Sequence, residues 1–291
     1  MALQVRPGAR GQAITASDAG WSYLSFETRR LSAGEALRLE RGEHESVVVN
    51  LFGETLEVEL DSGGRYEIAG RATVFDALPG ACYVPGSAAA VIRSASATIA
   101  VARAPTLGRV VRDPIVIRPQ DVSVEVRGSG RSTRQVNHIV TPEFPADRLL
   151  LVEVLTPAGN WSSWPPHKHD VDDLPNEAIL EEVYHYRFRR PQAWGLQRVY
   201  RPMLGDGRPA RDEAFSVGDG DVVLVPDGYH PFVANDRDDA YYLNALAGDH
   251  RTMACSFDPD LADVIEGWSG LAPDGRVPLV PSSGGADSSR I

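Results

Sequence analysis

The stretch "FSVGDGDVVLVPDGYHPFVA", residues 215–234, combines the features that indicate the fold. An acidic-glycine turn, an apolar run, a Pro-x-Gly turn and a second apolar run follow one another in this order. A similar stretch, "VFDALPGACYVPGSAAAVI", occupies residues 74–92, roughly 140 residues earlier. Similar units at this distance predict two like β-barrels in tandem.

Short apolar runs between glycines and prolines continue on both sides of these units. Their length and spacing are typical of β-strands, and helical periodicity is scarce. We therefore predict an all-β fold of two tandem jelly-roll-like barrels with few short helices. One short helix is expected at "LADVIEGW" (261–268), with Asp260 as its cap. The runs predicted as strands are "ESVVVNLFG" (45–53), "TLEVEL" (55–60), "YEIAGRATVF" (66–75), "ACYVPG" (81–86), "AAVIRS" (89–94), "ATIAVARAP" (97–105), "DRLLLVEVLTP" (147–157), "LEEVYHYRF" (180–188), "GLQRVYRP" (195–202), "HPFVAN" (230–235) and "YYLNALAG" (241–248).

The repeat divides the chain into three parts. Residues 1–112 are expected to form an N-terminal barrel without chemistry, because Ser87 and alanines stand where the second unit carries His230. Residues 113–271 are expected to form the C-terminal barrel, which carries the chemistry. Residues 272–291 are rich in Pro, Gly and Ser, so a loose tail is expected there.

The composition limits the possible partners. With 29 Lys and Arg against 40 Asp and Glu, the net charge is -11, and no basic surplus exists to bind nucleic acid. Cys82 and Cys255 lie far apart and form no ligand-spaced pair, which fits a reducing cytoplasm. The first residues contain no apolar signal core, and no run approaches a membrane span, so a cytoplasmic protein without membrane contact is expected.

Two histidines stand one residue apart in "WSSWPPHKHD", residues 161–170. On a strand, residues i and i+2 point to the same face, so His167 and His169 are expected to project together. Lys168 should then point the other way, and its replacement by alanine should have little effect. Two neutral imidazoles on one face are suitable ligands for Zn, Fe, Mn, Ni or Cu.

Two further ligand candidates follow in a characteristic order. Glu182 lies at the start of a predicted strand, and His230 ends a G-x5-P-x-G-x-H pattern. This order resembles the cupin superfamily, in which a small β-barrel binds one metal through three histidines and a glutamate. The resemblance implies that His167, His169, Glu182 and His230 hold a divalent ion in the C-terminal barrel. Such a set leaves room for water or substrate on the metal.

The identity of the acidic ligand has one alternative. The stretch "DVDDLPNEAIL" (170–180) makes the gap after His169 longer than is usual in cupins, so Glu181 could be the ligand instead. Strand parity places Glu182 on the same face as Tyr184, while Glu181 shares its face with His185. The family form of this stretch favours Glu182.

Longer blocks narrow the resemblance. They are "RQVNHIV" (134–140), residues 147–170, "LEEVYHYRF" (180–188), "LQRVY" (196–200) and "DGDVVLVPDGYHP" (219–231). Together they resemble the cupin family that contains 5-deoxy-glucuronate isomerase and 4-deoxy-threo-5-hexosulose-uronate isomerase. The resemblance implies an aldose–ketose isomerisation of a uronate-type sugar acid, 5-deoxy-D-glucuronate to 5-dehydro-2-deoxy-D-gluconate in inositol catabolism. It implies a metal-stabilised enediolate, one divalent ion with Zn first and Fe, Mn or Ni as alternatives, no organic cofactor, and a homo-oligomer.

Other residues are candidates for contact with the substrate. Proton transfer needs a general acid or base, and a substrate carboxylate calls for an arginine. Arg187 and Arg198 are alternatives to the preferred arginine. The candidates are Tyr184 and Tyr200 for catalysis, and Arg134, Gln197 and Tyr242 for substrate binding.

Two other functions fit the same ligand set. A cupin oxygenase would use Fe(II) and O2 with these ligands, because three histidines and a glutamate do not specify the metal. A sugar-binding cupin without catalysis would not need an open position on the metal. The family blocks favour the isomerase over both.

Overall fold

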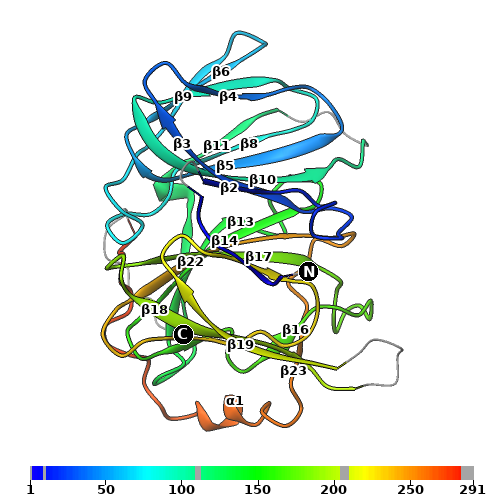
Figure 1. Ribbon diagram of the computed structural model, residues 1–291, viewed down its shortest axis with the longest axis vertical. Coiled ribbons are helices and arrows are strands. Elements are labelled where there is room, and N and C mark those ends of the chain that lie inside the picture. The colour runs from blue at the N-terminus through cyan, green and yellow to red at the C-terminus, as the bar shows by residue number, and fades with distance from the viewer. Residues whose placement is uncertain (1, 9–10, 109–112, 204–209, 283–291) are drawn as a thin grey trace.

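The computed structural model describes residues 2–8, 11–108, 113–203 and 210–282. It consists of two β-barrels stacked one above the other, the N-terminal barrel at the top of Figure 1 and the C-terminal barrel below it. In each barrel a large sheet faces a four-stranded sheet. Strands pair antiparallel throughout both barrels, and the predicted all-β fold of two barrels is confirmed.

The N-terminal barrel is filled with aliphatic side chains, among them Leu31, Val48 and Ile99. Its large sheet has the order β11 (Ile115–Ile117), β8 (Ala81–Val84), β5 (His44–Gly53), β10 (Ser96–Pro105), β3 (Ser25–Ser32), β2 (Gly11–Ile14). Its small sheet has the order β4 (Ala36–Leu39), β9 (Ala90–Arg93), β6 (Leu56–Leu60), β7 (Arg65–Ile68).

The C-terminal barrel is lined with aromatic side chains, among them Tyr184, Tyr186 and Phe232. Its large sheet has the order β1 (Gln4–Val5), β20 (Val222–Val225), β17 (Glu181–Phe188), β22 (Ala240–Ala247), β14 (Leu149–Thr156), β13 (Arg134–Val140), β12 (Ser123–Arg127). Its small sheet has the order β15 (Trp161–Ser162), β21 (Phe232–Ala234), β18 (Trp194–Arg201), β19 (Arg211–Gly218). A separate pair joins β16 (His167–Lys168) to β23 (Ser256–Phe257).

The two large sheets pack face to face and share one hydrophobic layer. Alternation along a strand separates this layer from the barrel interiors. On β5, Val47 and Val49 belong to the shared layer and Val48 to the N-terminal interior. On β17, Val183 belongs to the shared layer and Tyr184 to the C-terminal interior. The face that carries Tyr184 is therefore the face on which the sequence placed Glu182.

Each barrel also gives one carboxylate to the backbone of the other. Glu45 accepts hydrogen bonds from the N–H groups of Asp147, Arg148 and Leu149 at 2.6–2.8 Å. Glu181 accepts hydrogen bonds from the N–H groups at 22, 23 and 24, also within 3 Å. Bonds between an ionised acceptor and backbone N–H groups are stronger than neutral ones, so these carboxylates hold the barrels together.

The two barrels exchange their terminal strands. β1, at the start of the chain, pairs with β20 in the C-terminal barrel, whereas β11, after the connection, pairs with β8 in the N-terminal barrel. Both lie at the edges of their sheets. The predicted boundary after residue 112 falls within 109–112, which lie outside the described residues.

The tail is packed as far as Val280. Val280 is buried, its N–H donates to Gln135 Oε1 at 2.9 Å, and its carbonyl accepts from Gln135 Nε2 at 2.7 Å. Asp274 lies against Asn160 at 3.1 Å. In this part the tail covers the C-terminal barrel rather than hanging loose, and residues 283–291 lie outside the described residues.

Several local elements differ from the sequence prediction. Strands β2, β3 and β4 precede the first predicted run. β2 and β4 are only four residues long, and a glutamate and two arginines interrupt the apolar residues of β3. The helix α1 covers only Val264–Gly267, and Asp263 stands at its N-cap, so the assignment of Asp260 as the cap is wrong. A short 3-10 helix at Pro119–Asp121 was not predicted. No helix in the described parts of the chain has the length and apolar character needed to cross a membrane.

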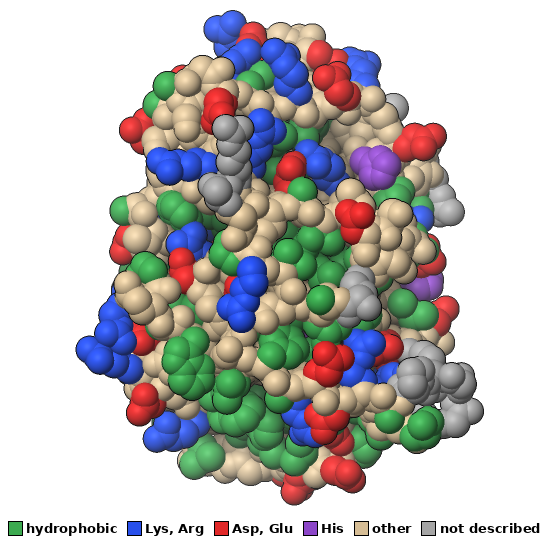
Figure 2. Space-filling model, in the orientation of Figure 1, with side chains coloured by type: hydrophobic (Ala, Val, Ile, Leu, Met, Phe, Trp, Pro, Cys, Tyr) green, Lys and Arg blue, Asp and Glu red, His purple; other side chains and the backbone are tan. Residues whose placement is uncertain are grey.

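Exposed hydrophobic side chains are concentrated on the C-terminal barrel. Figure 2 shows them over the lower half of the face in view, with charged side chains of both signs spread over the rest. Trp194 and Leu196 on β18 are about half exposed. The homo-oligomer expected from the sequence stays a prediction.

Candidate metal centre

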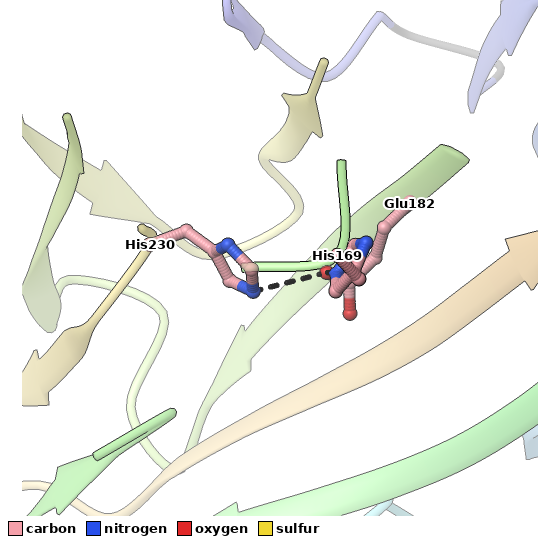
Figure 3. Close-up of side chains that lie close together, drawn as sticks. All are labelled: His169, Glu182 and His230. Carbon is pink, nitrogen blue, oxygen red and sulfur yellow. Dashed lines mark hydrogen bonds and ion pairs between the residues drawn. The ribbon is translucent and has the colours of Figure 1, made fainter. Parts of the chain in front are cut away.

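The centre lies inside the C-terminal barrel, where three side chains from separate segments meet. His169 follows β16, Glu182 lies on β17, and His230 lies between β20 and β21. Glu182 Oε2 is 2.9 Å from His169 Nε2 and 3.2 Å from His230 Nε2 (Figure 3). One ligand atom from each residue lies within 4.8 Å of the others, and all three residues are buried. Among the described residues, no other group of His, Cys, Asp and Glu meets this condition.

The histidine rings are oriented by backbone carbonyl groups. His169 Nδ1 donates to the carbonyl of Leu180 and His230 Nδ1 to that of Gly228, both at 2.9 Å. His167 Nδ1 faces the carbonyl of Pro165 at 3.4 Å. A carbonyl oxygen only accepts, so Nδ1 carries the proton and Nε2 keeps its lone pair in the neutral ring. Metal-binding histidines are oriented in the same way by a bond from the second nitrogen.

Burial keeps two of the rings neutral. It lowers the pKa of His230 to about 3, against the opposing effect of Glu182. Burial, together with the charges of His169 and Arg134, lowers the pKa of His167 to about 3. For His169, burial also lowers the pKa, but the hydrogen bond and charge of Glu182 outweigh it and raise the pKa. His167 and His230 are therefore unprotonated at neutral pH.

The donor set fits a divalent metal ion. His230 Nε2 is buried and has no hydrogen-bond partner among the described residues, although it points toward a carboxylate oxygen. Two imidazole lone pairs and a carboxylate facing one point repel one another unless a proton or a cation lies between them. Nitrogen and carboxylate oxygen donors are the ligands that Zn and related divalent ions prefer.

His167 lies beside this group but not within it. Its ring centre is 4.9 Å from that of His230 and 6.5 Å from that of His169. The structure thus brings three of the four predicted ligands together and leaves the fourth ring adjacent. Glu182 rather than Glu181 lies in the group, because Glu181 binds the backbone of the N-terminal barrel.

A cavity of about 340 Å³ opens onto the centre. Segments from three parts of the chain form its wall. The lining residues are Arg127, Arg134, Trp164, Pro165, His167, His169, Leu180, Glu182, Leu246, Met253, Ala254, Cys255, Phe257, Ile265 and Trp268. Three of the predicted ligands, His167, His169 and Glu182, therefore share one cavity with Arg134, the predicted carboxylate-binding residue.

Arg134 is a buried cation without an acidic partner. Its guanidinium donates to the carbonyl groups of Ser132 and Trp164 at 3.0 Å, and it forms no ion pair with any described residue. Burial lowers its pKa to about 10, so the guanidinium remains charged at neutral pH. The two alternatives are already paired, Arg187 with Asp219 and Arg198 with Asp212, both at 2.8 Å.

Tyr184 and Tyr242 pack beside the centre. Their ring centres are 4.8 Å apart, and that of Tyr184 is 5.8 Å from His230. The Tyr184 hydroxyl is hydrogen-bonded to Ser163 Oγ at 2.8 Å. Burial, with the charge of Glu182, raises the pKa of Tyr184 well above its ordinary value, so its hydroxyl keeps its proton.

Gln197 and Tyr200 lie away from the cavity. Gln197 Nε2 donates to the carbonyl of His230 at 2.6 Å, and its carbonyl oxygen accepts from the hydroxyl of Tyr186, so the amide supports the His230 backbone. Tyr200 donates to Asp258 and lines a separate apolar pocket on the outer sheet with Trp161. Direct contact of either residue with the substrate stays a prediction.

The sequence did not predict that residues 253–268 form part of the wall of the cavity. β23 pairs with the strand that carries His167, and Met253, Cys255 and Trp268 line the cavity. Burial raises the pKa of the Cys255 thiol. No motif marks this segment, since it contributes packing and a two-residue strand rather than ligand spacing.

Two stacked barrels, one of which contains a His–His–Glu group, define a two-barrel cupin. Oxalate decarboxylase from Bacillus subtilis shares this fold, with a TM-score of 0.60 and 12% identity over 94% of this chain and 87% of that one. The chain belongs to the KduI/IolB family, whose model matches residues 4–264.

Relatives with curated names agree with this assignment. A 5-deoxy-glucuronate isomerase from Geobacillus kaustophilus (strain HTA426) is 41% identical over 87% of this chain and 90% of its own length. The enzyme of the same name from Bacillus subtilis (strain 168) is 35% identical over 87% and 92%. The crystal structure of an IolB-like protein from Salmonella typhimurium LT2 has a TM-score of 0.84 and 36% identity over 91% of this chain and all of that one. The resemblance to this isomerase family is confirmed.

Proposed function

We propose that this chain is a metal-dependent aldose–ketose isomerase that converts 5-deoxy-D-glucuronate to 5-dehydro-2-deoxy-D-gluconate in inositol catabolism. The names of its relatives support the substrate and the reaction. The observation that carries the metal dependence is the orientation of the rings: the Nδ1 atoms of His169 and His230 are bonded to carbonyl groups, and both Nε2 atoms face Glu182.

His169, Glu182 and His230 would hold the ion, with His167 as the fourth ligand. When bound, a divalent ion supplies a Lewis acid that polarises the substrate carbonyl and stabilises negative charge on its oxygen. Zn is the first choice for nitrogen and carboxylate ligands, and Fe, Mn and Ni are alternatives.

The reaction takes one proton from C2 and returns one to C1, and the hydroxyl proton passes from O2 to O1 while the carbonyl moves from C1 to C2; it therefore needs a proton acceptor as well as a proton donor. A proton donor close to the centre serves this transfer. The hydroxyl of Tyr184 keeps its proton, and the ring of Tyr184 packs against that of His230, so we assign this residue as the donor.

Arg134 would bind the substrate carboxylate. It is a charged group in the wall of the same cavity as the ligands, it is buried, and it lacks an acidic partner among the described residues. An arginine binds a carboxylate with two parallel hydrogen bonds, which also fixes the orientation of the sugar. The aldehyde end of the substrate then faces the histidines.

Metal analysis and NMR test this function together. The purified protein should contain about one divalent ion per chain, and 5-deoxy-D-glucuronate in D2O should convert to the ketose, with deuterium at C1 if the transferred proton exchanges with solvent. Chelation should stop the conversion, and the metal should restore it. Oxygen consumption with this substrate would favour a cupin oxygenase, whereas binding without conversion would favour a sugar-binding protein.

A further inference from the structure

The residue between the two histidines of the HxH pair is the only lysine of the chain. The sequence contains 28 arginines and one lysine, Lys168, 29 in total. The side chain of Lys168 is nearly buried, although lysine is among the residues least often buried. A long cationic side chain is therefore held inside the protein next to two predicted ligands.

Lys168 is held by two buried carboxylates. Its Nζ lies 2.8 Å from Asp170 Oδ1, and 2.8 Å and 2.9 Å from the two oxygens of Glu177. Both carboxylates are at least as buried as the ammonium group. Burial lowers the pKa of Lys168, but the bonds to Asp170 and Glu177 outweigh it and raise the pKa, so the group stays charged.

The same carboxylates bind the backbone on both sides of the centre. Asp170 Oδ2 accepts from the N–H of Gly228 at 3.0 Å, and the carbonyl of Gly228 accepts from the ring of His230. Glu177 Oε1 accepts from the N–H groups of Asp170 and Val171 at 2.7 and 2.9 Å. One ionic group thus connects the HxH strand with the turn that carries His230.

The segment 170–180, which lengthens the usual cupin spacing, supplies these contacts. It begins directly after His169 and contains both carboxylates. It ends at Leu180, whose carbonyl accepts from His169 Nδ1 and whose N–H donates to the carbonyl of His169 at 3.0 Å. The extra length is folded back on the histidines and does not form a free loop.

We propose that Lys168, with Asp170 and Glu177, is a positioning group that sets the spacing of His169 and His230 for the metal. This inference rests on the proposed metal centre. It replaces the expectation that Lys168 has little effect, since removing the cation leaves two buried carboxylates facing each other. An ammonium group offers three donors, and three carboxylate oxygens surround this one. The planar fork of an arginine has a different shape and a larger volume.

The first experiment compares metal affinity in the whole chain. Zn binding to the metal-free parent is measured by competition with a chromophoric chelator, and the same is done for Lys168→Met. The dissociation constant should rise by about 10- to 100-fold, which is typical when a group that orients metal ligands is removed. Arg41→Met is the matched control, because it removes the cation of an exposed ion pair with Asp61 in the N-terminal barrel. It should leave the dissociation constant of the metal unchanged.

A second variant separates positioning from folding. Glu177→Gln keeps the Lys168–Asp170 pair and serves if Lys168→Met fails to fold; it should raise the dissociation constant less than Lys168→Met. The double variant should bind metal no more weakly than Lys168→Met alone, because the partners act as one unit. The inference is overturned, and the proposed function left intact, if Lys168→Met folds and binds metal as tightly as the parent. If Lys168→Met does not fold, the same result with Glu177→Gln overturns it. A parent that binds no metal overturns both.

A spectroscopic test uses the single lysine. Protein grown with ¹³C-labelled lysine gives one side-chain Cε signal, that of Lys168. Titration with Zn should shift this signal in the parent, because the ammonium group is bonded to the residues that orient the ligands. A signal that does not respond while the metal binds would contradict the connection.

Discussion

The two barrels share one architecture but differ at a few interior positions. In the register of the large sheets, Glu182 on β17 lies opposite Val225, as Ser46 on β5 lies opposite Val84. The comparison aligns "ESVVV" (45–49) with "EEVYH" (181–185). The first glutamate of each reaches the other barrel, and the second position is a serine in one barrel and the central carboxylate in the other.

This difference separates what the fold requires from what the chemistry requires. The interior of the N-terminal barrel is aliphatic, with Val48 where Tyr184 stands in its counterpart. A barrel of this kind folds around either interior, because the strands and turns carry the pattern in both. The metal centre needs only a few substitutions at matched positions, so several variants in one barrel can be compared with a matched position in the other.

The largest effect is expected from His230→Ala. The change removes one lone pair from the three that face the centre, so metal content should fall to background and turnover to the level without enzyme. Metal analysis and the NMR assay measure both. Ser87→Ala, in the turn of the first repeat that corresponds to the turn before His230, should change neither. Retained turnover in His230→Ala would refute the site.

The next largest effect concerns the carboxylates exchanged between the barrels. Glu45→Gln should lower the free energy of unfolding by about 3 kcal/mol, because three backbone N–H groups and the Tyr83 hydroxyl lose an ionised acceptor. Glu181→Gln makes the matching change at a less buried carboxylate. It should lower the free energy of unfolding by about 1 kcal/mol. Urea unfolding compares them, and equal losses would contradict the difference in burial.

A smaller effect is expected at the substrate carboxylate. Arg134→Met should raise KM by about 10- to 100-fold with a smaller change in kcat, since a bond to a charged group is lost. Arg198→Met, on the outer sheet, is the control. An analogue of the substrate without the carboxylate should be used equally by the parent and Arg134→Met. An equal loss with both substrates would exclude the carboxylate contact.

The smallest effect tests the shared layer between the barrels. His185 is buried there, and burial lowers its pKa to about 3, while the matched position of the other barrel is Val49. The unfolded chain protonates this ring below about pH 6.5 and the folded protein does not, so its contribution to stability is lost as pH falls from 6.5 toward 3. When the pH falls from 7.5 to 5, the free energy of unfolding of the parent should therefore drop by about 2 kcal/mol more than that of His185→Val. Parallel stability curves for the two proteins would contradict this assignment.

The sequence predicts the strands of the repeat well because their apolar runs are continuous. "ESVVVNLFG" corresponds to β5 and "LEEVYHYRF" to β17, each within about one residue. β3 was not predicted because "SFETRRLS" contains only two apolar residues, Phe26 and Leu31, among polar and charged ones. In 66–75 the strand ends at Ile68, since Gly70 approaches the backbone of Gly53 too closely for a side chain.

The candidate ligands could be predicted because their spacing is local to each strand. His167 and His169 stand in one pair, and the family form of the stretch, together with strand parity, favoured Glu182, which lies in the group, over Glu181. The role of Lys168 could not be predicted in this way, because its partner Glu177 lies in a segment without periodicity. The cavity wall from 253 onward also depends on tertiary packing, which local spacing does not encode.

The exchange of the terminal strands limits how the gene can be divided. A polypeptide cut after residue 112 would leave the first half without β11 and the second without β1, so each would expose a sheet edge that its own residues cannot cover. We expect the halves to aggregate when produced alone and to recover solubility when produced together. The position of β1 also bears on a purification tag fused at residue 1, which would start a few residues from β1. Only β20 separates β1 from β17, the strand that bears Glu182.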